Sequence, residues 1–209
     1  MYFTGFIAKG FKRDAFVDAS GRSTADQWDL QHIGWRADWK PNERDTFSAQ
    51  GDIFSGGAGT TFRIPTFEEP FVRTFNDNTR LGGGNFLSHW QRVFSASSDL
   101  RLQFYYDRNE GEDGVIEIQT DVFDIDFQHR FAPSTRQEIV WGAGYRRYQD
   151  ETAGSFKLSY LPAARNTDLF SAFFHDEIAL VEKRLRLALG AKFEHKDTGR
   201  PLRSAPAYR

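Results

Sequence analysis

Apolar and polar residues alternate along nine segments of the chain. Between Phe123 and Phe131 every second residue is aromatic, aliphatic or histidine, and Asp124, Asp126 and Arg130 are among the polar residues between them. A period of two is typical of a β-strand whose two faces meet different surroundings. The alternation therefore predicts strands at 2–11, 28–40, 45–55, 84–94, 99–108, 123–131, 137–148, 168–180 and 185–195.

The connections between these segments are alternately long and short. Outer-membrane barrels have tight turns on the periplasmic side and longer loops outside, and a strand of about ten residues can cross a bilayer core at a tilt. We therefore predict an all-β fold: an antiparallel up-and-down transmembrane β-barrel segment of about nine strands, with short periplasmic turns and long extracellular loops. The short connections are 41–44, 95–98, 133–135 and 182–184, and the long ones are 12–26, 56–83, 109–119 and 149–167.

Two irregularities are expected within this pattern. Trp28 and Leu30 have the opposite parity to the apolar residues that follow them, which predicts a β-bulge near Gln31 and His32. The long connection 149–167 is expected to contain a strand extension at 156–160, beyond the membrane.

Composition is compatible with a membrane barrel. The chain has 209 residues, 27 basic and 29 acidic residues and a net charge of -2, so nothing indicates a nucleic-acid partner. A mean hydropathy of -0.60 resembles that of a soluble protein, but only every second residue of a barrel strand faces lipid. The 21 Phe, 7 Tyr and 5 Trp residues suit the aromatic girdles at the two membrane interfaces.

The predicted polar faces carry charged residues, including Asp124, Asp126 and Lys192. A packed soluble barrel would fill its interior with apolar side chains, whereas a wide, wet lumen accepts charges. A two-sheet soluble sandwich could instead expose these residues to solvent, and that alternative stays open here.

The two ends of the sequence affect the expected domain organisation. No basic stretch followed by an apolar segment and a cleavage site occurs at the N-terminus, so a mature chain or a fragment is expected. The alternation ends near Gly199. We therefore divide the chain into a partial barrel, 1–199, and an irregular tail, 200–209.

Four segments of this sequence resemble barrel segments of TonB-dependent outer-membrane receptors. They are GWRADWKPNERDTFSAQGDIF, DVFDIDFQHRF, EIVWGAGYR and, most specifically, DLFSAFFHDEIALVEKRLRLALGAKFEH. The resemblance implies a plugged 22-stranded barrel in the cell outer membrane that takes up scarce ligands, chiefly ferric siderophores. It also implies that energy comes from the TonB complex.

The chain departs from the family pattern in three respects. It has no plug-like domain, no recognisable segment for contact with TonB, and an odd number of predicted strands, whereas bacterial barrels have an even number. We therefore expect part of a transport receptor, inactive alone, with outer-membrane lipid and a small ligand as partners. TonB would act only through the missing N-terminal part, and no enzymatic activity, cofactor or metal is expected.

The connection 56–83 is the best candidate site in the sequence. Arginine side chains can bind carboxylate or catecholate oxygens, and phenylalanine rings offer stacking area. We expect these residues to hold an anionic, partly aromatic ligand at the outer mouth, although the phenylalanines could instead pack the loop on itself. The candidate ligand-binding residues are Arg63, Phe67, Phe71, Arg73, Phe75 and Arg80.

Other chemistry has little support in the sequence. The five histidines lie on different predicted strands without metal-binding spacing, and a wet lumen explains Asp124 and Asp126 better than acid–base catalysis does. Two alternative functions remain open: a complete small outer-membrane barrel of eight to ten strands, and a soluble carbohydrate-binding β-sandwich.

Overall fold

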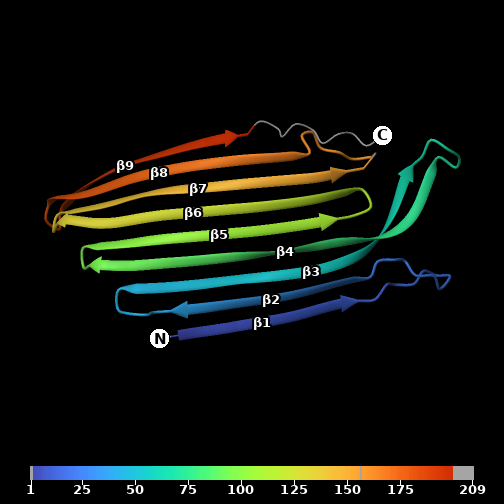
Figure 1. Ribbon diagram of the computed structural model, residues 1–209, viewed down its shortest axis with the longest axis horizontal. Helices are drawn as coiled ribbons and strands as arrows, with labels where there is room; N and C mark the ends of the chain where they lie inside the picture. The colour runs from blue at the N-terminus through green and yellow to red at the C-terminus, as the bar shows by residue number, and fades with distance from the viewer. Residues whose placement is uncertain (1, 156, 200–209) are drawn as a thin grey trace.

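The computed structural model describes residues 2–155 and 157–199, which form one antiparallel sheet of nine strands (Figure 1). Each strand pairs with its neighbours in sequence order, so the predicted all-β, up-and-down fold is confirmed. No helix of the described residues is long and apolar enough to span a membrane. The strands are β1 (Tyr2–Arg13), β2 (Trp28–Trp39), β3 (Asp45–Pro65), β4 (Val72–Ser95), β5 (Ser98–Glu112), β6 (Ile116–Ser134), β7 (Gln137–Gly154), β8 (Ala164–Val181) and β9 (Leu185–Thr198).

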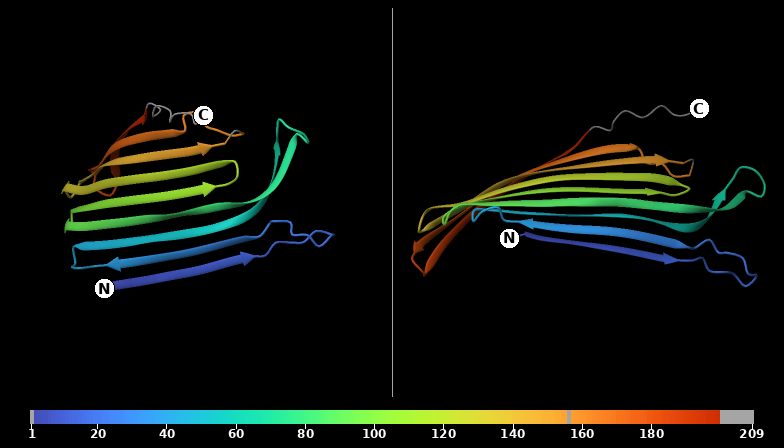
Figure 2. Two further views of the ribbon diagram at one scale, coloured as in Figure 1. Left: turned by 45° about the vertical axis from the view of Figure 1, so that its right-hand side comes forward. Right: turned by 60° about the horizontal axis from the view of Figure 1, so that its bottom comes forward.

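The sheet is twisted and does not close on itself (Figure 2). Strands β1 and β9 are its two edges, and each pairs on one side only. The tail 200–209 lies outside the described residues, and so does Phe156, where the predicted extension 156–160 began. The rest of that extension, 157–160, is not a strand.

Several predicted loops are in fact continuations of strands. The prediction of a loop over 56–83 was wrong, because β3 runs to Pro65 and β4 starts at Val72. Likewise β5 and β6 extend into 109–119, and β7 and β8 extend into 149–167. The backbone ladder continues where the apolar–polar alternation stops, because backbone pairing needs no apolar face.

The predicted bulge in β2 was also wrong. Strand β2 pairs one to one with both β1 and β3 from Trp28 to Trp39. Leu30 faces Gly56, where a Cβ would lie 3.1 Å from a Leu30 methyl carbon, so the leucine occupies space that a side chain would need. The register shifts that do occur lie beside short turns, at Val93/Ser95, Phe131/Ser134 and Ala179/Val181.

The register sorts the side chains of the sheet into two unlike faces. Directly paired residues share a face; one such row contains Trp39, Phe47, Trp90, Leu102 and Phe127. We call this the apolar face. The row Gln103, Asp126, Gly144 and Ser171 belongs to the opposite, polar face.

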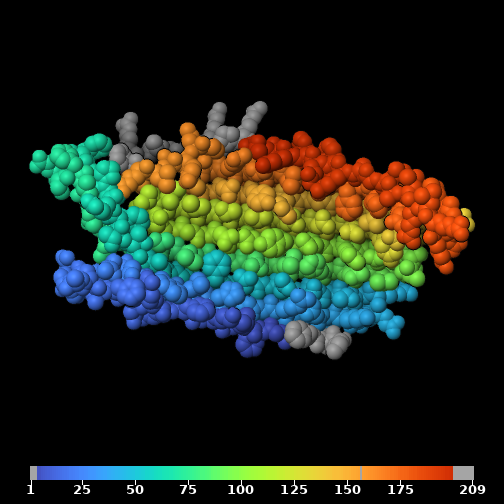
Figure 3. All heavy atoms as spheres, turned by 180° about the vertical axis from the view of Figure 1, so that it is seen from behind, coloured from blue at the N-terminus to red at the C-terminus, as the bar shows by residue number. Residues whose placement is uncertain are grey.

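Neither face is covered by another layer of the described chain. No hydrophobic residue among the described residues is buried, and many large ones are exposed, including Phe104, Ile125 and Trp141 at 37%, 43% and 41%. Figure 3 shows one face as a single layer of adjacent strands. An apolar surface of this extent needs lipid or protein over it.

Gly142 provides a test of packing on the polar face. A Cβ at this position would lie 2.5 Å from a Phe173 ring carbon and 2.4 Å from the carbonyl oxygen of Phe127. We expect Gly142→Val to destabilise the sheet by roughly 1–3 kcal/mol through overpacking. Denaturant unfolding in dodecylphosphocholine micelles, followed by circular dichroism, measures the effect. Gly10→Val is the control, since a Cβ at Gly10 has nothing within 4 Å, and equal losses from both variants would contradict the prediction.

Candidate functional site

The candidate residues lie on a long hairpin made by the ends of β3 and β4. Pairing of β4 with β5 ends at Arg80 and Glu112, and pairing of β2 with β3 ends at Trp28 and Ala58. The hairpin therefore projects beyond its neighbours and bends away from them (Figures 1 and 2). Its tip is the turn 66–71, which contains Phe67 and Phe71.

The tip is held by backbone hydrogen bonds and an aromatic pair. The Thr66 amide donates to the Phe71 carbonyl at 3.0 Å, and Phe71 has a positive φ of 61°. The rings of Phe62 and Phe75 stack with centroids 5.6 Å apart, and the Arg73 guanidinium lies 5.5 Å from the Phe75 ring centroid. Arg73, Phe75 and Phe62 thus form one cluster, which we call the tip cluster.

The three candidate arginines do not converge on one site. Arg73 pairs with Ile64 and shares a face of the hairpin with Phe62 and Phe75, whereas Arg63 pairs with Thr74 on the opposite face. Arg80 pairs with Gly57, which is six residues before Arg63 on β3, so Arg80 lies on the same face as Arg63. Its Nη1 lies 3.7 Å from Glu112 Oε2. A single anionic group therefore cannot contact all three guanidinium groups.

A broad groove of about 1020 Å³ lies at the base of the hairpin. Its walls come from β2 to β7 and the start of β8. Its described lining residues include five carboxylates and one guanidinium, that of Arg80. The charged lining residues are Asp29, Arg80, Glu110, Glu112, Glu117 and Glu151.

The groove was not predicted from the sequence, because most of its acidic residues fall in segments without apolar–polar alternation. Glu110, Glu112 and Glu117 were assigned to a loop, so no relative positions could be given to them. In the structure, Glu112 pairs directly with Glu117 across β5 and β6. The positions of Glu110 and Glu112 could have been predicted by extending the alternation of the preceding strand. Both are separated from Phe104 and Tyr106 by even numbers of residues, so they lie on the same face if the strand continues.

The β1–β2 connection lies at the same end of the sheet as the hairpin (Figure 1). Asp18 accepts hydrogen bonds from the Ser20 hydroxyl and the Arg22 amide, and these bonds lower the pKa of its carboxyl. Asp26 accepts bonds from the Thr24 hydroxyl and the Phe16 amide, which lower its pKa in the same way. Both carboxylates therefore accept hydrogen bonds from within the loop and help to order it.

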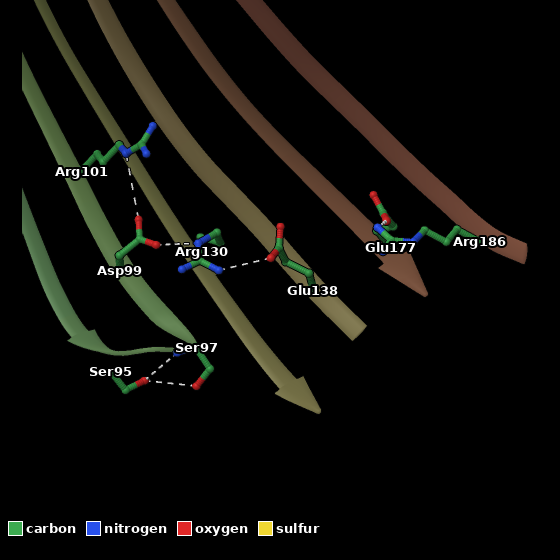
Figure 4. A network of polar contacts seen from close by, with 8 residues as sticks. All are labelled: Ser95, Ser97, Asp99, Arg101, Arg130, Glu138, Glu177 and Arg186. Carbon is green, nitrogen blue, oxygen red and sulfur yellow. Dashed lines mark hydrogen bonds and ion pairs between the residues drawn. The ribbon is translucent and has the colours of Figure 1, made fainter. Parts of the chain in front are cut away.

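A charged network crosses the polar face at the opposite end, near the short turns (Figure 4). Asp99 contacts Arg101 at 4.0 Å and Arg130 at 2.5 Å, and Arg130 in turn contacts Glu138 at 3.1 Å. A separate pair, Glu177 with Arg186, continues across β8 and β9. Charges of both signs are balanced within these contacts, which suits a polar face exposed to water.

Among the described residues, no three His, Cys, Asp or Glu side chains come close enough together to hold a metal ion. Three of the five histidines have other partners. His32 lies 3.6 Å from Asp52, His89 is hydrogen-bonded to Gln103, and His129 is hydrogen-bonded to Ser98 and Trp141.

Comparison with known proteins supports the fold alone. No protein-family model and no curated protein matches this sequence. A solved structure, the copper transporter OprC, is similar over 95% of this chain with a TM-score of 0.53 and 13% sequence identity. The chain spans about a third of the length of that structure, 34%. The nine strands therefore share the fold of about a third of that structure.

Proposed function

We propose that the nine strands are one arc of a transmembrane β-barrel in an outer-membrane transport protein. The main support is the sheet itself: neighbouring antiparallel strands, one apolar face without cover and one charged face. Barrels of this kind place alternate residues against lipid and against a polar lumen. The structural similarity to OprC agrees with this proposal at the level of fold.

The strand directions limit how the barrel can close. Each strand is antiparallel to the next, so the edge strands β1 and β9 run in the same direction. An all-antiparallel barrel then needs an odd number of further strands between them. Two copies of residues 2–199 in the same orientation would place β9 against β1 in parallel, so two such copies alone do not form an all-antiparallel barrel.

The tip cluster is the part of the candidate site that suits an anionic, partly aromatic ligand. It combines the guanidinium of Arg73 with the stacked rings of Phe62 and Phe75. We propose that a ferric siderophore or a similarly scarce ligand contacts this cluster, with the ligand class taken from the sequence resemblance. We further propose that the protein transports rather than catalyses, and that TonB acts through segments outside this chain.

Ligand uptake by the complete barrel protein tests the proposed site. Arg73→Ala is expected to weaken ligand binding several-fold, because it removes the guanidinium that lies over the Phe75 ring. Arg80→Ala is the matched control, since Arg80 lies on the other face and pairs with Glu112. Unchanged binding in Arg73→Ala, or an equal loss in both variants, would reject the tip cluster as the contact site.

The side of the membrane is tested with introduced cysteines. The chain has no cysteine, so Thr66→Cys and Ser134→Cys each give a single thiol. A membrane-impermeant maleimide added to whole cells is expected to label position 66 and not position 134. The opposite pattern would reverse the proposed orientation, and labelling of both in a soluble fraction would reject the membrane barrel.

A further inference from the structure

One arrangement of four side chains occurs three times on the apolar face. An aromatic residue and an arginine two positions later lie on one strand, and an aspartate and a phenylalanine two positions apart lie on a neighbouring strand. The aromatic residue pairs directly with the phenylalanine, and the arginine with the aspartate. The three sets are Tyr106, Arg108, Asp121 and Phe123; Tyr145, Arg147, Asp168 and Phe170; and Trp90, Arg92, Asp45 and Phe47.

The contacts within the first two sets are almost identical. The Tyr106 hydroxyl donates to Asp121 at 2.6 Å, and the Tyr145 hydroxyl donates to Asp168 at 2.6 Å. Arginine–aspartate distances are 3.7 Å for Arg108 and 3.8 Å for Arg147. The Tyr–Phe ring centroids are 4.7 Å and 4.9 Å apart, each with an interplanar angle of 37°.

The third set repeats this chemistry with tryptophan. Trp90 Nε1 donates to Asp45 at 3.0 Å, Arg92 lies 3.7 Å from Asp45, and the Phe47 and Trp90 rings stack at 5.8 Å. In all three sets the aspartate side chain is mostly covered, with exposed fractions of 13%, 23% and 10%, and the arginine is about two-fifths exposed. We call these sets the boundary clusters.

The boundary clusters lie at opposite ends of the apolar face. The two tyrosine clusters lie toward the projecting hairpin, and the tryptophan cluster lies toward the short turns. In each cluster the arginine lies on the same face as the aromatic residue and two residues nearer the end of the strand. Between the two ends, the apolar face of β5 to β7 carries no acidic residue, lysine or arginine; its members include Leu102, Phe104, Ile125, Phe127 and Trp141.

The separation of the two ends matches a bilayer. Along β6, Phe123 and Phe131 are roughly 26 Å apart at about 3.3 Å per residue. A strand tilt of about 40° reduces this to roughly 20 Å, and the side chains at each end bring the apolar band close to the height of about 25 Å seen in outer-membrane barrels. The first tyrosine cluster contains Phe123 and lies at one end of this band, and the tryptophan cluster, whose aromatic row meets β6 at Phe127, lies toward the other end.

We propose that the three boundary clusters bind the two headgroup layers of a lipid bilayer and fix the depth of the sheet in the membrane. The phenylalanine would lie on the hydrocarbon side, and the tyrosine or tryptophan would span the boundary with its polar group toward water. The arginine would extend into the headgroups while its paired aspartate stays covered. This inference rests on the proposed placement of the chain in a membrane.

The test uses the full chain in dodecylphosphocholine micelles, with one nitroxide label at a time on an introduced cysteine. Glu117→Cys lies beyond Asp121 on the same strand and face, and Ile125→Cys lies on the hydrocarbon side of Phe123. We expect collisions with a water-soluble nickel chelate to dominate at 117 and collisions with oxygen to dominate at 125, with the accessibility ratio differing several-fold. Gln149→Cys and Ala143→Cys should show the same difference on β7.

Removal of a cluster tests its role in setting depth. Asp121→Leu should raise the ratio of oxygen to nickel-chelate collisions at position 117. Without the aspartate charge, this end of β6 is expected to move deeper into the micelle. Asp124→Leu is the matched control, since Asp124 forms an ion pair with Arg146 on the polar face of the same strand. An unmoved boundary in Asp121→Leu, or an equal movement in both variants, would overturn the proposal.

The outcomes separate the two proposals. If the micelles leave positions 125 and 143 open to water, the membrane placement itself fails. If the micelles cover 125 and 143 but the transition lies away from the clusters, the membrane placement stands and the depth-fixing role is overturned.

Discussion

In water without detergent, the isolated chain is expected to associate into large aggregates. Two features cause this: within residues 2–155 and 157–199 nothing covers the apolar face, and there β1 and β9 each pair on one side only. Open strand edges pair with other chains in water and are not tolerated in hydrocarbon. Size-exclusion chromatography with light scattering measures the outcome, and a monodisperse, detergent-free monomer would contradict it.

In dodecylphosphocholine micelles the same chain is expected to be dispersed and rich in sheet, but not to form a closed barrel. Amide hydrogen exchange should therefore be slow in β4 to β6, which are paired on both sides, and fast in alternate residues of β1 and β9. An unheated gel sample should show no compact, faster-migrating band. Such a band, together with protection of both edges, would show that the chain closes alone.

The second large effect is expected from arginine on the apolar face. Phe104 lies between the boundary clusters and is 37% exposed in the absence of lipid. Phe104→Arg should cost about 2–4 kcal/mol, the range for a basic residue near the bilayer midplane. The free energy of unfolding is measured by denaturant titration of the protein in lipid vesicles.

Gln103→Arg is the matched control for this substitution. It is the preceding residue of β5, lies on the polar face and pairs directly with Asp126. A new guanidinium there meets a carboxylate, so we expect a change below about 1 kcal/mol. If the two variants lose equal stability, the two faces of β5 do not differ in their surroundings.

The sequence was sufficient to predict nine strands, their antiparallel order and all four short connections. This worked because one face of each strand is mostly apolar, which leaves a strong period of two, as in 123–131. The prediction failed where that requirement ends. Beyond Gly56, residues such as Thr60, Thr61 and Asn76 are polar on both faces, yet they remain in the β3–β4 ladder.

The sites were less predictable than the strands. Arg63, Arg73 and Arg80 are close in sequence, but the register alone decides that they divide between two faces. Gly83 was assigned to the connection 56–83, whereas it lies within β4 and a Cβ there would lie 2.9 Å from the Phe54 ring. The boundary clusters combine residues from neighbouring strands, so they become visible only when the pairing of those strands is known.

Nitroxide accessibility along β6, from Asp121 to Phe131, tests the central claim most directly. Each position is replaced in turn by cysteine in a chain that has none of its own, and the labelled chain is placed in dodecylphosphocholine micelles. A barrel arc predicts a period of two, with oxygen reaching 125 and 127 and the nickel chelate reaching 124, 126 and 128. Equal access of the water-soluble chelate to both faces would contradict the claim that one face of this sheet lies against lipid.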